Sequence, residues 1–320
     1  MTTGAIHRVM LYRSMLDTIG NTPLVEMPNL SPSETVRFFA KLEGQNPTGS
    51  VKDRIAKAMI EAAERDGTLS PGCTILEPTS GNTGVSLAFV AKLKGYKVKV
   101  VMPDGMSPER TALLRAYGAE IVYSDAAQGT NGSIVVAQEM AAADPSLIML
   151  YQYGNQANPG AHYEGTGPEI LRDLPEVDVF IAGLGTGGTL TGAARYLKER
   201  KPSVKVIAAA PHPGDRVQGL RSLEEGFIPP VLDQSLLDGR IVVDSKNSFA
   251  ATKELLEKEG IFAGVSGGSV LRTAQRVAQR MHRANIVLLF ADGGWKYLST
   301  DLWNIEYEDL PEDLDEKVWW

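Results

Sequence analysis

The sequence predicts an α/β fold of two domains, each with a mainly parallel sheet flanked by helices. Short apolar runs rich in β-branched residues alternate with segments of helical periodicity along most of the 320 residues. This alternation is typical of βαβ units, whose parallel strands are buried on both faces. Nine or ten strands are expected, which is more than the usual single sheet holds, and this favours two sheets.

The elements follow in order along the chain. Strands are expected at Leu24–Val25, Val36–Leu42, Cys73–Leu76, Val98–Met102, Ile121–Tyr123, Ile148–Tyr151, Val179–Ala182, Val204–Ala208, Arg240–Val243 and Ile286–Phe290. One helix is expected from the turn that contains Lys52 to about Ala63, and others at Thr83–Leu93, Pro108–Tyr117, Ser133–Ala143, Pro168–Arg172, Thr189–Glu199, Phe249–Glu259 and Val270–His282. In such folds ligands gather at the carboxyl ends of strands, where loops meet helix N-termini.

Composition excludes several classes of protein. Hydrophobic residues make up 43% of the chain and charged residues 22%, as in ordinary globular proteins. The formal net charge of −7 argues against a surface for nucleic acid or anionic membranes. Cys73 is the only cysteine and the four histidines are scattered, so neither an intramolecular disulfide nor a metal site is expected. We expect a soluble, cytoplasmic protein.

The loop Asn46–Arg54 follows the strand Val36–Leu42 and leads into a helix. Thr48 or Ser50 can cap this helix, which places Lys52 in its first turn. The positive end of the helix dipole there favours the neutral amine, which can attack a carbonyl and form a Schiff base. A surface lysine after a capped turn is the simpler interpretation, and the neighbouring loops must decide between the two.

Two glycine patterns suggest phosphate binding. Gly44 and Gly49 have the spacing of a P-loop, but Ser50 and Val51 stand where that motif requires Lys followed by Ser or Thr. The loop Gly183–Thr189 satisfies G-x-G-x-x-G, yet the next strand ends without the carboxylate that a dinucleotide ribose needs. A compact phosphate at a helix N-terminus is therefore the better interpretation.

Two further strand-end loops are rich in small hydroxyl residues and glycine, namely Glu77–Gly84 and Gly264–Ser269. The first suits a carboxylate or a phosphate, or is simply a helix N-terminus. In the second, Ser266 either caps the helix or contacts a ligand. A Schiff-base lysine together with a phosphate cradle that lacks a nucleotide partner points to pyridoxal 5′-phosphate.

Four motifs in order carry a resemblance to a known family. They are Ile19–Leu24, Asn46–Arg54, Pro78–Gly84 and Gly185–Thr189. With them the chain resembles, from about Leu16 to Asp301, the cysteine synthases of the tryptophan-synthase-β-like, fold-type II group of pyridoxal-phosphate enzymes. Leu150–Asn155 and Asp292–Thr300 are similar to the B-type enzymes, in particular to the actinobacterial form that takes O-phosphoserine.

The resemblance implies roles for individual residues. Lys52 would be the Schiff-base lysine and the catalytic base. The cofactor would be bound by Gly185, Thr186, Gly187, Gly188 and Thr189 at its phosphate, by Asn82 at its ring oxygen and by Ser266 at its pyridine nitrogen. The α-carboxylate of the amino-acid substrate would be bound by Thr79, Ser80, Thr83 and Gln152.

The implied reaction is a β-replacement. An O-activated serine loses its β-leaving group to give an α-aminoacrylate, and a sulfur nucleophile then adds to form L-cysteine. Arg221 matches an arginine of the O-phosphoserine-using relatives, and its guanidinium suits a phosphate, so O-phosphoserine is the expected donor. Sulfide or a thiocarboxylated small carrier protein would supply the sulfur, and the family implies a homodimer.

The resemblance also suggests domain limits. Residues 1–45 and 159–305 would form the larger domain that binds the cofactor phosphate, and residues 46–158 a smaller, mobile domain with the substrate loop. Residues 306–320 form an acidic tail that ends in Trp319-Trp320. Two terminal indoles are unusual on a solubilising tail, so we hypothesise that it covers the active-site cleft as a lid.

Several alternatives stay open. An O-acetylserine enzyme that uses sulfide would not need Arg221. A cystathionine β-synthase or a dehydratase is related chemistry, although Gln152 favours cysteine synthesis. A nucleotide-dependent dehydrogenase would rest on Gly183–Gly188, and a non-catalytic relative would be a binding or scaffold protein. The visible absorbance of bound pyridoxal phosphate separates the first three from the dehydrogenase.

Overall fold

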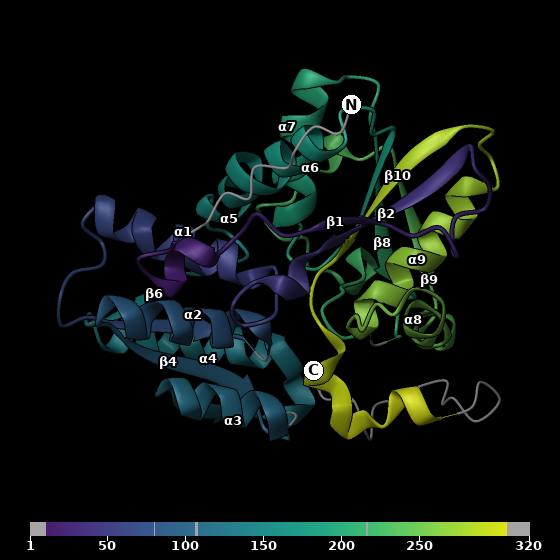
Figure 1. Cartoon of the computed structure of the whole chain (residues 1–320). Coiled ribbons are helices and arrows are strands. Elements are labelled where there is room, and N and C mark those ends of the chain that lie inside the picture. Colours follow the sequence, from purple (N-terminus) through teal and green to yellow (C-terminus); the bar gives the residue numbers. More distant parts are fainter. Residues whose placement is uncertain (1–10, 80, 106–107, 216, 306–320) are drawn as a thin grey trace.

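The computed structural model describes residues 11–79, 81–105, 108–215 and 217–305, and its helices surround two separate sheets (Figure 1). The larger sheet has the strand order β1-β2-β10-β7-β8-β9, and its neighbours pair in parallel except for β1 with β2. Its strands are β1 (Leu24–Glu26), β2 (Val36–Leu42), β7 (Val179–Gly183), β8 (Lys205–Pro211), β9 (Gly239–Val243) and β10 (Ala284–Phe290).

The smaller sheet is parallel throughout and has the order β5-β4-β3-β6. Its strands are β3 (Thr74–Pro78), β4 (Lys97–Pro103), β5 (Glu120–Ser124) and β6 (Leu147–Met149). The predicted α/β fold with two mainly parallel sheets is therefore confirmed. These four strands lie within residues 46–158 and the other six lie outside, while the predicted domain limits themselves stay a prediction.

Helices cover both sheets. They are α1 (Lys52–Arg65), α2 (Asn82–Lys94), α3 (Pro108–Tyr117), α4 (Gly129–Ala143), α5 (Ala157–Ala161), α6 (Gly167–Asp173), α7 (Gly188–Arg200), α8 (Ser245–Glu259) and α9 (Val265–Ala278). A π-helical turn, η4 (His162–Thr166), joins α5 to α6, and the 3₁₀ segment η7 (Gly294–Thr300) follows β10. No helix in the described ranges is long and apolar enough to cross a bilayer.

Strand β7 shows why the strands of the larger sheet are apolar throughout. Val179 and Ile181 belong to the core beneath α8 and α9, whereas Phe180 and Ala182 belong to the core beneath α6 and α7. Successive side chains of a strand point to opposite faces, so burial on both faces requires a continuous apolar run. Figure 1 shows the two helix pairs on either side of this sheet.

Helix α9 corrects one prediction. The sequence places Gly264–Ser269 in a loop and starts the helix at Val270, but the helix begins at Val265 and includes Ser266 in its first turn. The glycines there serve close helix packing instead of a turn: a Cβ on Gly268 would overlap the backbone oxygen of Ser248 in α8. Helix propensity alone underestimates such a segment, because glycine is unfavourable inside a helix.

Strand β6 corrects a second prediction. The predicted strand Ile148–Tyr151 ends at Met149, and Tyr151 adopts a left-handed backbone with φ of 57°. The buried side chain of Glu77 accepts hydrogen bonds from the backbone N–H groups of Tyr151 at 2.8 Å and Gln152 at 2.9 Å. This side chain, contributed by β3, turns the chain out of the sheet, and no local sequence signal announces it.

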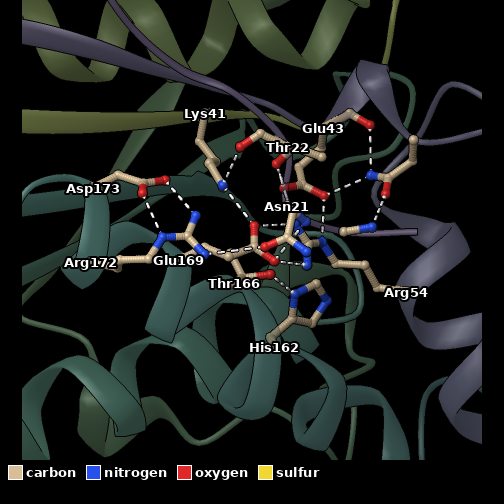
Figure 2. A network of polar contacts seen from close by, with 12 residues as sticks. Asn21, Thr22, Lys41, Glu43, Arg54, His162, Thr166, Glu169, Arg172 and Asp173 are labelled. Atoms are coloured by element: carbon tan, nitrogen blue, oxygen red, sulfur yellow. Dashed lines mark hydrogen bonds and ion pairs between the residues drawn. The ribbon is translucent and has the colours of Figure 1, made fainter. Parts of the chain in front are cut away.

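A buried ionic network holds the start of α1 (Figure 2). The Arg54 guanidinium donates to Glu43 at 2.7 and 2.9 Å and to Glu169 at 2.7 Å from each of two nitrogens. Lys41 from β2 is fully buried and contacts Glu169 at 2.7 Å. These contacts join β2, α1 and α6, and so fix the direction in which α1 leaves the larger sheet.

Candidate active site

Four strand ends converge on one cavity. Lys52 follows β2, Gly185 follows β7, Gly219 and Arg221 follow β8, and Thr79 follows β3 of the smaller sheet. They line a cavity of about 150 Å³, and an adjoining cavity of about 60 Å³ shares Lys52 and Gly185 with it. The site therefore lies between the two sheets at the carboxyl ends of their strands, as the fold class predicts.

Lys52 is the first residue of α1 and lines both cavities. Burial lowers the pKa of its ammonium, and the negative charge of Asp292 opposes this shift only in part. The N-cap of α1 is Val51, without a side-chain capping bond, so neither predicted residue is the N-cap; Ser50, one residue earlier, accepts a hydrogen bond from the Lys52 N–H at 3.3 Å. Thr48 is not a cap: its hydroxyl and N–H both donate to Asp53, at 2.5 and 2.7 Å.

The loop Gly185–Thr189 forms a backbone cradle at the start of α7. Gly187 has φ of 85°, and a Cβ on Gly185 would lie 2.6 Å from the backbone oxygen of Gly219. A Cβ on Gly188 would overlap the Asn158 side chain, which in turn donates to Thr186 Oγ1 at 3.2 Å. Glycine is therefore required here by space and by backbone conformation, and the N–H groups that it exposes suit a phosphate.

The histidine of the π-helical turn connects this cradle to the ionic network. His162 lies 3.2 Å from Thr189 Oγ1 through Nε2 and 2.9 Å from Thr166 Oγ1 through Nδ1. Burial, with the positive charge of Arg54 next in importance, lowers the pKa of His162 to about 3. The imidazole is therefore neutral, and it braces the hydroxyl at the rim of the glycine loop.

A second group of polar side chains surrounds the N-terminus of α2. Thr79, Thr83 and Gln152 all line the larger cavity. Thr83 donates its hydroxyl to Gln152 Oε1 at 2.7 Å, which leaves the Gln152 amide nitrogen available as a donor. Together with the helix N-terminus they form a donor-rich surface that suits a carboxylate. Ser80 lies outside the described residues.

Asn82 and Ser266 lie beside the smaller cavity, together with Asp292 after β10. The Asn82 side chain donates to Asp292 Oδ2 at 2.7 Å and accepts from the Lys296 ammonium at 2.7 Å. Tyr297 also donates to Asp292 Oδ2, at 2.7 Å. This group of side chains comes from α2, the end of β10 and η7, and it places an amide between two charged groups.

Two arginines line the larger cavity. Arg221 lies over the rings of Tyr153 and Phe227, with its guanidinium carbon 5.5 and 4.8 Å from their centroids. Arg110 from α3 also lines the cavity, and its guanidinium contacts Gln218. Among the described residues that line this cavity none is Asp or Glu. The cavity therefore favours an anionic ligand.

The structure brings most of the predicted site residues together. Lys52, Thr79, Asn82, Thr83, Gln152, Gly185, Thr186, Gly187, Thr189, Arg221 and Ser266 line one or both cavities, and Gly188 lies in the same glycine loop. The acidic tail with Trp319-Trp320 lies outside the described residues. Sequence reasoning missed Asp292, Tyr297 and Arg110, although Asp292 directly follows a predicted strand and could have been found by that rule.

Comparison with known proteins identifies the family. A family model described as pyridoxal-phosphate dependent enzyme matches residues 15–292. The chain belongs to this family. Cysteine synthase B of Salmonella typhimurium is 41% identical over 291 residues, which cover 91% of this chain and 96% of the relative.

Solved structures agree. A cysteine synthase from Entamoeba histolytica superposes with a TM-score of 0.87 at 33% identity, covering 96% of this chain and 95% of the other. An O-ureido-L-serine synthase gives the same TM-score at 38% identity, covering 96% and 98%. The chain is a B-type, fold-type II cysteine synthase that depends on pyridoxal phosphate, and it forms cysteine by β-replacement. The predicted family, cofactor and enzyme class are confirmed.

The residues present fit pyridoxal 5′-phosphate. In the glycine loop at α7 a Cβ at Gly185 or Gly188 would collide with Gly219 or Asn158, so only glycine permits this backbone cradle, and a phosphate would occupy it. Lys52 lines the same pair of cavities as this loop, and burial favours its neutral amine. A phosphate site and a reactive amine in one cavity are what a cofactor with a phosphate and an aldehyde requires.

Proposed function

We propose that this cysteine synthase uses O-phosphoserine as its donor and that Lys52, the glycine loop and Arg221 perform the main tasks. The observation that carries the donor assignment is the cavity lined by Arg110 and Arg221 without a carboxylate among its described lining residues. A phosphate carries up to two negative charges at neutral pH, whereas an acetyl ester carries none. An acid-free cationic cavity therefore discriminates in favour of the phosphorylated substrate.

Lys52 moves the proton at Cα of the substrate. When bound, pyridoxal phosphate supplies an electron sink that makes this proton acidic. A lysine acts as a base only as the free amine, and burial of Lys52 lowers its pKa toward the range where that form is populated. The start of α1 holds the side chain at the wall of the cavity, so the same amine can return the proton after the replacement.

Thr79, Thr83 and Gln152 orient the amino-acid substrate. Gln152 Oε1 accepts a hydrogen bond from the Thr83 hydroxyl, so the Gln152 amide nitrogen is the group that donates to the substrate carboxylate. Glu77 supports this arrangement from behind, because it holds the backbone N–H groups of Tyr151 and Gln152. Binding the α-carboxylate here leaves the β-substituent to reach Arg221, which lines the same cavity.

Arg221 binds the phosphate that leaves. Its guanidinium presents several donors in a fixed plane, and the rings of Tyr153 and Phe227 hold that plane in place. A pre-positioned guanidinium loses little side-chain freedom on binding, so more of the interaction contributes to recognition. The leaving group is stabilised as its charge grows, which speeds its departure.

The donor assignment is tested by comparing kcat/KM for O-phosphoserine and O-acetylserine, with sulfide as the sulfur source. We expect O-phosphoserine to be preferred, and Arg221→Gln to lower its kcat/KM on the order of 30- to 100-fold, the size of a lost charge-assisted contact. O-acetylserine turnover should change little. Arg195→Gln, on the exposed face of α7, is the matched control.

A preference for O-acetylserine in the wild-type protein, or an equal loss for both donors in Arg221→Gln, would contradict the assignment. The sulfur donor is a separate question. We propose that either sulfide or a thiocarboxylated small carrier protein serves, and a comparison of the two at saturating O-phosphoserine decides between them. Sedimentation of the purified protein tests the proposed homodimer.

A further inference from the structure

Lys296 is a buried charge that the reaction leaves unexplained. It lies in η7, is 1% exposed, and does not belong to the described residues that line either cavity. Its ammonium donates to Asn82 Oδ1 at 2.7 Å, and the carboxylates of Asp292 and Asp53 lie near enough to oppose the effect of burial on its pKa. Burying an ammonium is costly, so its contact with Asn82 calls for a reason.

The Asn82 amide is held by a hydrogen-bond donor on one side and a hydrogen-bond acceptor on the other. The Lys296 ammonium can only donate hydrogen bonds, and it meets the amide oxygen. An ionised Asp292 carboxylate can only accept, and its Oδ2 meets the amide nitrogen at 2.7 Å. Tyr297 donates to the same carboxylate oxygen, which is consistent with an ionised Asp292.

This arrangement fixes which way the amide faces. Turning the Asn82 side chain by half a turn would set its nitrogen against the Lys296 ammonium and its oxygen against the Asp292 carboxylate. Both hydrogen bonds would be lost and replaced by donor–donor and acceptor–acceptor contacts. In the observed orientation the oxygen and one N–H are engaged, so the second N–H is the polar group of the amide that is left for a ligand in the cavity.

We propose that Lys296, together with Asp292, is a positioning residue that makes Asn82 a hydrogen-bond donor toward the ring oxygen of the cofactor. This rests on the proposed role of Asn82 as the side chain at that oxygen. A donor that cannot turn into an acceptor stabilises the ionised ring oxygen and disfavours the protonated one. Lys296 thus acts on the cofactor through Asn82 and does not itself line either cavity.

Lys296→Met tests this, because methionine keeps the apolar stem and removes the donor. We expect the apoprotein to bind pyridoxal 5′-phosphate roughly tenfold more weakly, since Asn82 loses a hydrogen bond to a charged group. Tryptophan fluorescence during cofactor titration measures this affinity. The pH midpoint of the visible cofactor band should rise, because the ring oxygen is more easily protonated when the donor is no longer fixed.

Lys296→Arg distinguishes positioning from packing. It keeps a donor for Asn82 Oδ1 and should recover most of the affinity and of the pH midpoint, although its side chain has a different shape. Lys205→Met, an exposed lysine at the start of β8, is the control for losing a positive charge and should behave as the wild type. Melting curves of each apoprotein show whether the variants fold.

The outcomes separate this inference from the proposed function. A wild-type apoprotein that binds no pyridoxal phosphate would overturn the function itself. If it binds, but Lys296→Met binds equally well with the same pH midpoint, the positioning role alone is wrong. If Lys296→Met does not fold, a crystal structure of the wild-type holoenzyme decides: Lys296 Nζ farther than about 3.5 Å from Asn82 Oδ1 overturns the proposal.

Discussion

Two cations in the first turn of α1 have opposite surroundings. Lys52 opens into the cavities between the sheets, where burial lowers its pKa. Arg54, two residues later, is bound by Glu43, Glu169 and Thr22 from three other parts of the chain. The charge of Arg54 is fully compensated, whereas the charge of Lys52 is disfavoured. The same helix turn thus supplies a scaffold contact on one side and a reactive amine on the other.

The contrast between Lys52 and Arg54 shows how the fold keeps a reactive group in place. Arg54 and its carboxylates hold the beginning of α1 against β2 and α6, and this limits how far Lys52 can move. A positioned catalytic group gains its advantage from such restraint. Losing the scaffold should therefore cost stability, and losing the amine should cost activity.

The largest effect is expected from removing the amine. Lys52→Ala should lower kcat by about 10³-fold or more, because the proton at Cα loses its base. Borohydride reduction of the loaded protein should no longer attach the cofactor to this position, as peptide mass spectrometry would show. The variant should be at least as stable as the wild type, since a buried amine is removed. Cofactor attached at Lys52 in the wild type is the required reference, and attachment elsewhere would refute its role.

Breaking the scaffold comes next. Arg54→Met should lower the free energy of unfolding by about 3–5 kcal/mol, because buried Glu43 loses the cation that it contacts and Glu169 keeps only Lys41. Denaturant unfolding measures this. Arg172→Met removes a half-exposed ion pair with Asp173 on the same helix as Glu169 and should change stability by less than about 1 kcal/mol. Equal losses in the two variants would show that the buried network stabilises the protein no more than a half-exposed ion pair does.

A third ionisable side chain, that of buried Glu77, extends the comparison to the pH dependence of stability. Burial raises the pKa of Glu77 to about 7, although the N–H groups of Gln152 and Tyr151 oppose the shift. The unfolded carboxyl ionises near its ordinary value of 4.5 while the folded one keeps its proton, so Glu77 favours the folded state most at low pH. Its contribution is lost as the pH rises from about 4.5 to about 7, by about 3 kcal/mol in total.

Glu77→Gln has no ionisation to lose. The difference in unfolding free energy between wild type and variant should therefore fall across this pH window and stay constant above it. Chemical denaturation at several pH values measures the difference. A difference that is flat from pH 4.5 to 7 would show that Glu77 ionises normally in the folded protein.

The smallest effect is expected at Ser50, the residue before the N-cap of α1. Ser50→Ala removes the oxygen that accepts from the Lys52 N–H, and it should destabilise the protein by about 1 kcal/mol, the size of one hydrogen bond. Thermal melting measures this, and Thr68→Ala in the exposed loop after α1 is the control. A loss as large as that of Arg54→Met would mean that the Ser50 hydrogen bond, and not the ionic network, holds the turn.

Some of the site could be predicted from local patterns and some could not. The glycines of Gly185–Thr189 predict a phosphate cradle because they lie together at a strand–helix junction. Asn158, His162 and Glu77, which support the cradle and the substrate loop, carry no such signal. Each acts on a residue brought near by the fold, as Glu77 does on Gln152 across two neighbouring strands.

By itself, the sequence determined the alternation of strands and helices, the junctions where the site had to lie and, through its motifs, the family. Hydrophobic periodicity and glycine placement are local properties, so they can be recognised in short stretches of sequence without knowledge of the fold. Tertiary structure decided that Lys52 is partly buried near Asp292, that α9 begins at Val265, and that Asn82 lies between Lys296 and Asp292. These depend on desolvation and on contacts between residues far apart in the chain, which only packing creates.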